Sequence, residues 1–140
     1  MVPQWQMMNI GCDIESTETF RKKWKEEDMK FFERIFSKDE IEYCKKFKDP
    51  SPHFAARFCA KEAIVKAANE FCSLVISDVQ IAKNKNNAPV VEVWKKRTTT
   101  AKFFTQFQIM VSLSHTSDMA MACVLIQKIE MVRRSPRIGK

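Results

Sequence analysis

The chain has 140 residues, and 45% of them are hydrophobic, including 11 Phe and 3 Trp, which is enough apolar material for the core of a single domain. Its 24 Lys and Arg exceed its 17 Asp and Glu, and the resulting net charge of +7 favours a polyanionic partner. Charge alone does not choose among nucleic acid, an anionic membrane, an acidic protein and a phosphorylated cofactor. No segment approaches the roughly 18 apolar residues of a membrane span, and the N-terminus lacks the features of a secretory signal. We therefore expect a soluble, cytoplasmic protein.

The N-terminal part predicts a strand followed by a polar helix. Residues 7–14 form an apolar run typical of a buried strand, in which Gly11 permits a close backbone approach. Ser16 or Thr17 then caps a helix that we expect to continue to about Lys30, with aromatic residues on one side and basic residues on the other.

Two further helices are predicted before the middle of the chain. The sequence Ser37-Lys38-Asp39-Glu40 matches a capping box and begins a helix that we expect to end near residue 47. Ser51 and Pro52 then suit the N-cap and first position of a long helix over residues 52–71.

The long helix over residues 52–71 has a predicted packing side and a predicted chemical side. At about 100° per residue, Arg57 and Lys61 form one pair a turn apart, and Glu62 and Lys66 form another pair away from the core. The residues on the predicted core face are Ala56, Cys59, Ala60, Ala63, Ile64, Ala67 and Phe71.

The second half of the chain predicts strands and a basic tail. Alternating or continuous apolar runs indicate strands at residues 79–82, 89–94, 105–113 and 119–128. Together with the helices they predict an α+β fold, an antiparallel β-sheet packed against a long central helix, in a single domain over residues 1–128. We expect residues 129–140 to form a poorly ordered basic C-terminal tail.

The five cysteines of the chain contain no C-x-x-C pair, and several lie in apolar stretches. They predict reduced and mostly buried thiols rather than a disulfide framework or a zinc site. The cysteines are Cys12, Cys44, Cys59, Cys72 and Cys123.

Two acidic residues lie in unusual settings, because a carboxylate at the end of an apolar strand or on a core helix needs a cation or a hydrogen-bond donor. They are Asp13 and Glu62, which are separated by too many residues for a local metal-binding loop. Spacing alone favours a turn residue for Asp13 and an ion pair of Glu62 with Lys66 within the helix.

Three segments, in this order, resemble the motifs of the holo-acyl-carrier-protein synthase family. Ile-Gly-Cys-Asp-Ile at residues 10–14 matches G-x-D-(I/V), and Ser-Leu-Ser-His-Thr at residues 112–116 matches S-x-S-H-(S/T). The most specific match is residues 57–67, which fit R-F-x-x-K-E-A-x-x-K-A. The resemblance covers about residues 7–127 and implies a 4'-phosphopantetheinyl transferase-like fold.

The resemblance also implies an activity, namely transfer of the 4'-phosphopantetheine arm of coenzyme A to a serine of apo acyl carrier protein. The reaction releases adenosine 3',5'-bisphosphate and belongs to fatty acid biosynthesis. Asp13 and Glu62 correspond to the family's Mg²⁺ ligands, with water and the coenzyme A diphosphate completing the shell. Arg57, Lys61 and Lys66 correspond to cations that face phosphate, and Lys66 is expected nearest the transferring diphosphate. The base that accepts the serine proton is either a metal-bound water or a carboxylate, and the sequence does not decide between them.

Further coenzyme A contacts follow from the same resemblance. His115 belongs to the S-x-S-H-(S/T) motif, whereas His53 shares no such context and is expected on the surface. In the link between the predicted strands at residues 79–82 and 89–94, Asn87-Ala88-Pro89 stands where the family has G-x-P. The contacts implied in this way are Asn87, Pro89, Ser114, His115 and Thr116.

The first helix is the predicted partner-binding surface. The resemblance implies that Arg21, Lys22, Lys23 and Lys25 meet the acidic recognition helix of acyl carrier protein. It also implies a homotrimer whose active sites lie between neighbouring subunits. An alternative from another class is a non-enzymatic module that binds nucleic acid through residues 21–25 and 133–140, although no nucleic-acid-binding motif accompanies them.

Overall fold

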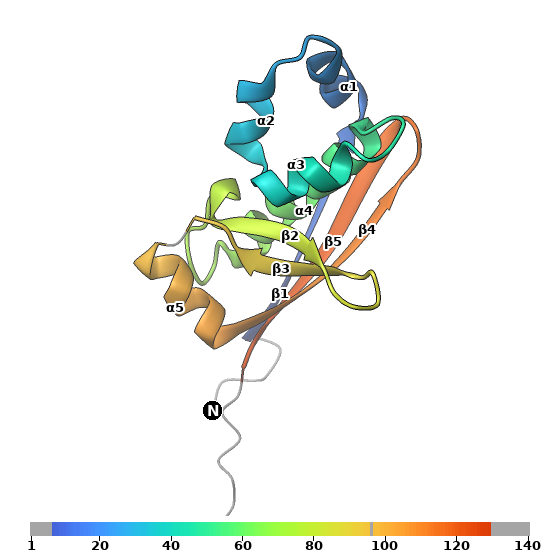
Figure 1. Ribbon diagram of the computed structural model, residues 1–140. Coiled ribbons are helices and arrows are strands. Elements are labelled where there is room, and N and C mark those ends of the chain that lie inside the picture. The colour runs from blue at the N-terminus through green and yellow to red at the C-terminus, as the bar shows by residue number, and fades with distance from the viewer. Residues whose placement is uncertain (1–6, 96, 130–140) are drawn as a thin grey trace, which may run out of the picture.

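The computed structural model describes residues 7–95 and 97–129 and confirms the predicted α+β architecture (Figure 1). The long helix α4 (Ser51–Ala68) packs against a three-stranded sheet, and most of the other helices and a two-stranded hairpin lie on its remaining sides (Figure 1). Of the predicted tail, only Ile129 lies within the described residues. In chain order the elements are β1 (Met8–Ser16), α1 (Glu18–Lys25), α2 (Met29–Ile35), α3 (Lys38–Cys44), α4 (Ser51–Ala68), the 3₁₀ helix η2 (Ile76–Asp78), β2 (Val79–Lys83), β3 (Pro89–Val93), α5 (Thr98–Gln106), β4 (Phe107–His115) and β5 (Met119–Lys128).

The strands form two antiparallel sheets rather than one. The three-stranded sheet has the order β1-β5-β4, so β1 and β4 are its two edges, and β2 pairs with β3 in a separate hairpin. Burial alternates along the strands of the larger sheet, because successive side chains point to opposite faces. One face packs on α4, and we call the other face the open sheet face. No helix in the described part of the chain has the length and apolar character needed to cross a membrane.

Gly11 is the point of closest approach between β1 and α4. A Cβ atom at this position would lie 2.1 Å from the carbonyl oxygen of Ala63 and 3.1 Å from the Cβ of Ala67. No larger residue fits here unless the strand or the helix moves. The prediction that Gly11 permits a close backbone approach is therefore confirmed.

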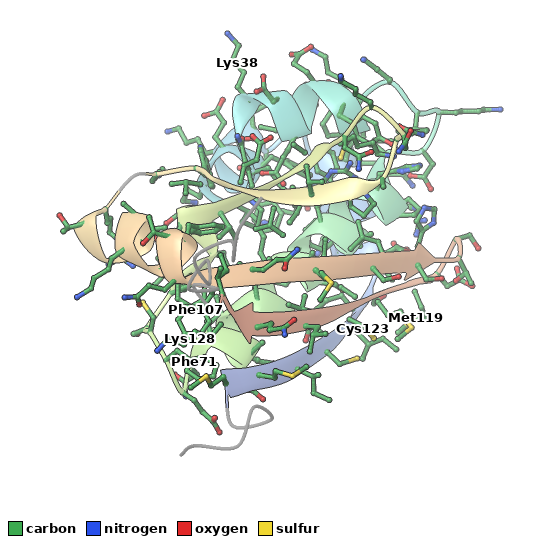
Figure 2. The ribbon with its side chains drawn as sticks, turned by 90° about the horizontal axis from the view of Figure 1, so that it is seen from below. Lys38, Phe71, Phe107, Met119, Cys123 and Lys128 are labelled. Atoms are coloured by element: carbon green, nitrogen blue, oxygen red, sulfur yellow. The ribbon has the colours of Figure 1, made fainter. Side chains whose placement is uncertain are left out.

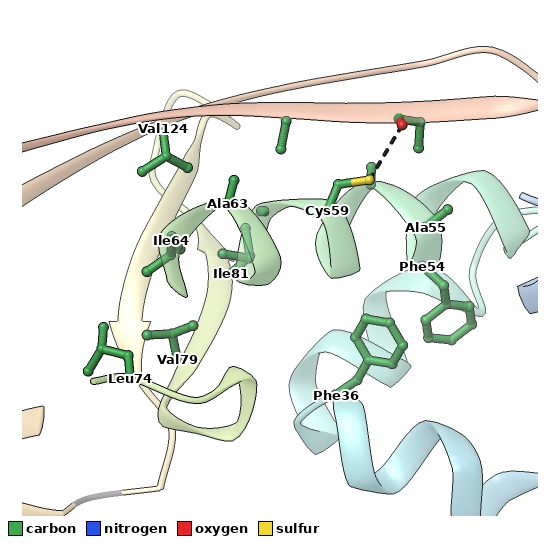
Figure 3. Packing of buried hydrophobic residues seen from close by; sticks show 14 of the residues in the cluster. Phe36, Phe54, Ala55, Cys59, Ala63, Ile64, Leu74, Val79, Ile81 and Val124 are labelled. Carbon is green, nitrogen blue, oxygen red and sulfur yellow. Dashed lines mark hydrogen bonds between the residues drawn. The ribbon is translucent and has the colours of Figure 1, made fainter. Parts of the chain in front are cut away.

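Helix α4 is buried on nearly all sides, because its many alanines allow other elements to approach closely (Figure 3). The side that faces the sheet includes Cys59, whose Sγ donates a hydrogen bond to the carbonyl oxygen of Ala120 (3.4 Å). Phe54 and Ile64 pack in the layer on the other side of the helix (Figure 3). Except for Phe71, which follows the helix, all residues of the predicted core face are buried in it.

The predicted helix up to Lys30 is interrupted after its second turn. Glu27 has a φ of 55°, which a right-handed helix cannot accommodate, and α1 therefore ends at Lys25. Asp28 then caps α2 by accepting a hydrogen bond from the backbone N–H of Phe31 (3.2 Å). The aromatic side chains that predicted one amphipathic helix instead pack together from two helices.

Helix α5 is not predicted by the sequence pattern, because it begins with three threonines, which have low intrinsic helix propensity. Tertiary contacts stabilise it. Asp78 accepts hydrogen bonds from the guanidinium of Arg97 (2.7 and 2.6 Å) and from Oγ1 of Thr100 (3.1 Å), and Phe103 is buried. These hydrogen bonds attach the first turn of α5 to Asp78 of η2, and they outweigh the low helix propensity of the threonines.

A buried ion pair joins α3 to α4. The predicted capping box is confirmed, since Glu40 Oε1 accepts a hydrogen bond from the Ser37 N–H (2.9 Å), and the same oxygen accepts one from Lys61 Nζ (2.7 Å). Glu40 Oε2 accepts a further bond from the N–H of Ile81 in β2 (3.2 Å), and Lys61 also donates to the carbonyl of Ile35 (2.7 Å). One carboxylate and one ammonium group thus connect four elements.

This ion pair corrects the predicted role of Lys61. Its side chain has no solvent exposure, and burial lowers its pKa although Glu40 acts in the opposite direction. The expectation that Lys61 faces a phosphate is wrong in this structure, because its donors are committed inside the protein. Helical spacing predicts the angle of Lys61 around the axis of α4, but it does not predict that α3 and β2 cover that side of the helix.

We predict that Lys61→Met lowers the free energy of unfolding by about 3–5 kcal/mol, because it leaves the Glu40 carboxylate buried without its cation. Urea unfolding followed by circular dichroism measures the loss. Lys38→Met, at an exposed position of α3, is the matched control and should change stability by no more than about 0.5 kcal/mol. Wild-type stability of Lys61→Met would contradict the structural role of the pair.

Candidate active site

Asp13 and Lys66 are brought together at the edge of the sheet. Asp13 lies on β1 and faces α4, where Lys66 Nζ donates hydrogen bonds to Asp13 Oδ1 (2.9 Å) and to the carbonyl of Cys12 (3.3 Å). The bond to Asp13 raises the pKa of Lys66. Lys66 thus pairs with Asp13, and the intrahelical pair with Glu62 is absent from the ion pairs of the described residues.

Two further carboxylates lie beside this pair. Glu62 is half-buried on α4, one turn before Lys66. Glu15 is half-buried on the same face of β1 as Asp13, and its pKa is raised by burial and then by the negative charges of Asp13 and Glu62. The prediction missed Glu15, although the two-residue period of a strand places it on the same face as Asp13. We call Asp13, Glu15, Glu62 and Lys66 the carboxylate edge.

The carboxylate edge has the chemistry of a site for a hard divalent cation. Asp13 Oδ2 is buried and has no hydrogen-bond partner, so one carboxylate oxygen is left for a ligand. Oxygen ligands of this kind suit Mg²⁺, which usually keeps several waters or substrate oxygens. No group of three or more Asp, Glu, His or Cys side chains in residues 7–95 and 97–129 is arranged to enclose a metal. A cation bound here would therefore take further ligands from water or from a substrate.

A separate pocket of about 430 Å³ lies between α4, β4 and the hairpin of β2 and β3. We call it the Arg57 pocket. It contains four of the predicted coenzyme A contacts, from segments far apart in the sequence. The lining residues are Tyr43, Phe47, His53, Ala56, Arg57, Lys83, Asn87, Pro89, Val111, Ser112, Leu113 and His115.

Arg57 supplies a guanidinium to this pocket that forms no ion pair within residues 7–95 and 97–129, and its Nη1 donates to the carbonyl of His53 (3.5 Å). Only 3% of the residue is exposed, and its predicted contact with a phosphate stays a prediction. Its Cζ atom lies 4.1 Å from the ring centre of Tyr43, a cation–π contact, and its Nε is buried without a hydrogen-bond partner. Lys83 Nζ also lies near the same ring, at 4.7 Å. A buried guanidinium with an unused donor favours an anionic ligand such as a phosphate.

Two histidines meet at the pocket, whereas the sequence singled out only one. His53 stacks on Phe47 with ring centres 3.5 Å apart, and its ring centre lies 4.8 Å from that of His115. Burial, and then the charges of His115, Arg57 and Lys83, lower the pKa of His53 to about 4. His53 is therefore a neutral wall of the pocket at pH 7, and it is half-buried rather than fully exposed as a surface residue would be.

The loop between β2 and β3 explains why asparagine stands where the family has glycine. Asn87 has a φ of 63°, a left-handed conformation that asparagine tolerates better than most residues. Asn84 Oδ1 stabilises the turn by accepting hydrogen bonds from the N–H groups of Asn86 (2.8 Å) and Ala88 (3.1 Å). The substitution therefore preserves a tight turn and leaves Asn87 and Pro89 at the pocket.

Ser114 and Thr116 do not reach the pocket of their own chain. Ser114 is exposed and, by the alternation along β4, lies on the open sheet face. Thr116 Oγ1 accepts hydrogen bonds from the N–H groups of Asp118 (3.2 Å) and Met119 (3.1 Å), which close the turn between β4 and β5. Their role as cofactor contacts stays a prediction.

The four basic residues of α1 are not equivalent. Arg21 is paired with Glu18 and Asp49 (both 2.9 Å) and donates to the carbonyl of Ser117 (2.8 Å), so it joins α1 to two loops. Lys23 contacts Glu26 at the end of α1 (3.8 Å) and Asp28 at the start of α2 (3.4 Å). Only Lys22 and Lys25 are exposed and lack an ion pair within the described part of the chain. The predicted basic surface thus reduces to these two lysines.

The carboxylate edge and the Arg57 pocket lie on opposite sides of α4. Lys66 follows Arg57 by nine residues, which corresponds to about 180° around the helix axis at roughly 100° per residue. The two sites also lie at opposite edges of the sheet, because Asp13 is on β1 and His115 is on β4. A single chain therefore presents two half-sites rather than one closed site.

Comparison with known proteins explains this combination. A sequence profile of the 4'-phosphopantetheinyl transferase superfamily matches residues 9–124, which include both half-sites. The chain belongs to this superfamily.

Relatives within the superfamily narrow the assignment. A holo-[acyl-carrier-protein] synthase of Leptospira biflexa is 33% identical over 127 residues, covering 87% of this chain and 98% of the relative. One of Protochlamydia amoebophila is 36% identical over 117 residues, covering 82% and 93%. The crystal structure of the Helicobacter pylori holo-[acyl-carrier-protein] synthase in complex with coenzyme A has a TM-score of 0.70 and 33% identity, covering 84% of this chain and 99% of that one. The chain is an enzyme of the holo-[acyl-carrier-protein] synthase type.

Proposed function

We propose that the protein transfers the 4'-phosphopantetheine group of coenzyme A to a serine of apo acyl carrier protein in a Mg²⁺-dependent reaction that releases adenosine 3',5'-bisphosphate. The observation that supports this proposal is that the chain has two kinds of binding group, carboxylate oxygens on β1 and α4 and a buried guanidinium in the Arg57 pocket whose Nε has no hydrogen-bond partner in the described residues. The relative from Helicobacter pylori was solved with coenzyme A, and the relatives are named for an acyl carrier protein product.

The reaction is displacement at a diphosphate by a serine hydroxyl, so binding geometry and charge neutralisation govern its rate. A Mg²⁺ ion held by Asp13 and Glu62 would stabilise negative charge on the diphosphate oxygens. The side chain of Lys66 is 55% exposed. When Mg²⁺ binds Asp13, the ammonium group of Lys66 can therefore leave Asp13 and pair with a phosphate oxygen instead. Arg57 and His115 bind the phosphate of the adenosine part, and neutral His53 with Phe47 forms an apolar wall beside it.

We predict that Asp13→Asn and Glu62→Gln each lower the transfer rate by at least about 100-fold, because each removes charge from the site that stabilises the reacting diphosphate. The measurement is transfer from coenzyme A to apo acyl carrier protein over a Mg²⁺ titration. Calorimetric titration with Mg²⁺ and coenzyme A gives a second readout, in which the cation should bind more weakly to both variants.

Glu33→Gln, at an exposed position of α2, is the matched control and should retain wild-type transfer. Near-wild-type turnover of Asp13→Asn or Glu62→Gln at limiting Mg²⁺ would contradict the proposal that these residues bind Mg²⁺. Absence of transfer by the wild-type protein would remove the proposed function itself.

We further propose that the active protein is a homotrimer in which the carboxylate edge of one subunit meets the Arg57 pocket of the next. A contact between different surfaces that closes after three copies produces such a ring, and the two half-sites lie at opposite sheet edges. The open sheet face supports an interface because it carries exposed apolar side chains. They are Ile10, Ile14, Met110, Met119 and Met121, with exposures of 39–75%.

We predict that Met121→Glu converts the trimer to monomers, because it places a charge on the central strand of the open sheet face, opposite Ile14. Sedimentation velocity measures the mass, and circular dichroism checks the fold. Lys22→Glu on α1 is the control and should remain trimeric. A wild-type protein that is monomeric and fully active would refute the shared site.

The acidic carrier protein is proposed to dock on α1, now through Lys22 and Lys25. Both lysines are exposed, whereas Arg21 and Lys23 are held by carboxylates of the same chain. Cations on a fixed helix favour encounter with an acidic helix and fix its register.

We predict that the double variant Lys22→Gln/Lys25→Gln raises the KM for carrier protein by roughly threefold to tenfold, since exposed charge pairs are worth about 0.2–1 kcal/mol each. The KM for coenzyme A should not change, and added salt should reduce the difference from wild type because the Debye length is about 8 Å at physiological ionic strength. Lys128→Gln at the end of β5 is the control. Unchanged carrier kinetics together with lost, strongly salt-dependent oligonucleotide binding would favour a nucleic-acid surface instead.

A further inference from the structure

Arg21 connects α1 to two segments that carry walls of the Arg57 pocket. Its Nη2 donates a hydrogen bond to the carbonyl of Ser117 (2.8 Å), in the β4–β5 turn (residues 116–118). Its Nε and Nη2 donate to Asp49 Oδ2 (3.3 and 2.9 Å), in the α3–α4 loop (residues 45–50). Figure 1 shows the turn and the loop close to α1. One guanidinium group therefore bridges three parts of the chain.

Thr17, the residue before α1, holds the same turn. It is fully buried, its Oγ1 donates to the carbonyl of Ser117 (2.6 Å), and its backbone N–H donates to the carbonyl of Asp118 (2.9 Å). Arg21 Nη1 donates in turn to Thr17 Oγ1 (3.3 Å). Met119, labelled in Figure 2, marks the end of the sheet where this turn lies. The start of α1 and the turn are thus joined by a connected set of hydrogen bonds.

The turn and the loop both continue directly into the aromatic lining of the Arg57 pocket. The β4–β5 turn begins immediately after His115, and the α3–α4 loop contains Phe47. Both rings pack against His53, with ring centres 4.8 Å from His115 and 3.5 Å from Phe47. The placement of these two walls relative to each other therefore depends on the bridge that Arg21 makes behind them.

A guanidinium suits this bridge better than an ammonium group. Its N–H groups lie in one plane at fixed angles, so it can bind a carboxylate and a carbonyl at the same time. The side chain of Arg21 is 22% exposed, and acceptors within the protein bind its Nε, Nη1 and Nη2. Lys22 and Lys25 on the same helix are exposed. Arg21 is therefore placed for an internal role and not for recognition of a partner by its charge.

We infer that Arg21 is a positioning residue for coenzyme A, because it holds the α3–α4 loop and the β4–β5 turn where the Arg57 pocket can bind the adenosine end of that ligand. The inference rests on the proposed function, which places coenzyme A in this pocket. It assigns Arg21 to the coenzyme A site, whereas the sequence resemblance implied contact with acyl carrier protein. Apparent affinity falls with the fraction of molecules whose pocket is formed, so loosening either wall weakens binding without loss of a ligand contact.

The test is the variant Arg21→Lys, which keeps the positive charge and loses the planar arrangement of donors. In calorimetric titration, adenosine 3',5'-bisphosphate should bind roughly threefold to tenfold more weakly than to wild type, because fewer molecules have a formed pocket. In the transfer assay the KM for coenzyme A should rise by a similar factor, with kcat and the KM for carrier protein unchanged. Arg34→Lys, at an exposed position of α2, is the matched control and should equal wild type in both assays.

Hydrogen exchange gives a readout that needs no ligand and no transfer. The backbone N–H of Thr17 is bonded to the turn, and the N–H of Ser51 donates to Asp49 Oδ1 in the loop (3.1 Å). In Arg21→Lys the α3–α4 loop and the β4–β5 turn should exchange faster than in wild type, whereas the interior of α4 should keep its protection. Equal exchange in the two proteins would overturn the inference.

Asp49→Asn removes the carboxylate from the other end of the bridge. It should weaken nucleotide binding as Arg21→Lys does, and the double variant should lose less affinity than the two single losses multiplied, because both changes break one interaction. If Arg21→Lys does not fold, Asp49→Asn decides the question.

Two outcomes of the binding and transfer assays would overturn the inference. One is a raised KM for carrier protein with unchanged nucleotide binding, which would return Arg21 to the docking surface. The other is a wild-type protein that does not bind the nucleotide. Nucleotide binding without transfer would instead contradict only the proposed reaction, and the affinity ratio between Arg21→Lys and wild type would still decide the role of Arg21.

Discussion

The close contact between the backbone of Gly11 in β1 and the carbonyl of Ala63 in α4 controls where the acidic residues of the site lie. Because no side chain separates strand from helix at this point, the next inward-facing residue of β1, Asp13, comes within hydrogen-bond distance of Lys66. Alanines on α4 maintain the same short separation along the rest of the sheet. The site geometry thus depends on the absence of a side chain as much as on the presence of carboxylates.

Two lysines on α4, five residues apart, show how burial gives similar ion pairs different roles. The pair of Lys61 with Glu40 is fully buried, and the ammonium group of Lys61 donates its hydrogen bonds to Glu40 and to the carbonyl of Ile35. The pair of Lys66 with Asp13 has an exposed cation and an aspartate with one unused oxygen. A buried pair is costly to break and serves architecture, whereas an exposed pair exchanges partners readily.

The separation of the two half-sites gives a physical reason for assembly. The Arg57 pocket and the carboxylate edge lie on opposite sides of one helix, so a small ligand cannot contact both within a chain. A ring of copies would resolve this separation and would cover the apolar side chains of the open sheet face at the same time.

The sequence by itself determined the α+β class, the five strands, the capping box at Ser37, the core face of α4 and the family, because these depend on local periodicity and on ordered motifs. Tertiary structure decided which charged residues are accessible. Lys61 and Arg57 are buried, Arg21 is an internal bridge and His53 lies in a pocket, since each is covered by an element distant in the chain. Periodicity gives the angle of a side chain around its helix, but it does not say which other segment folds over that angle.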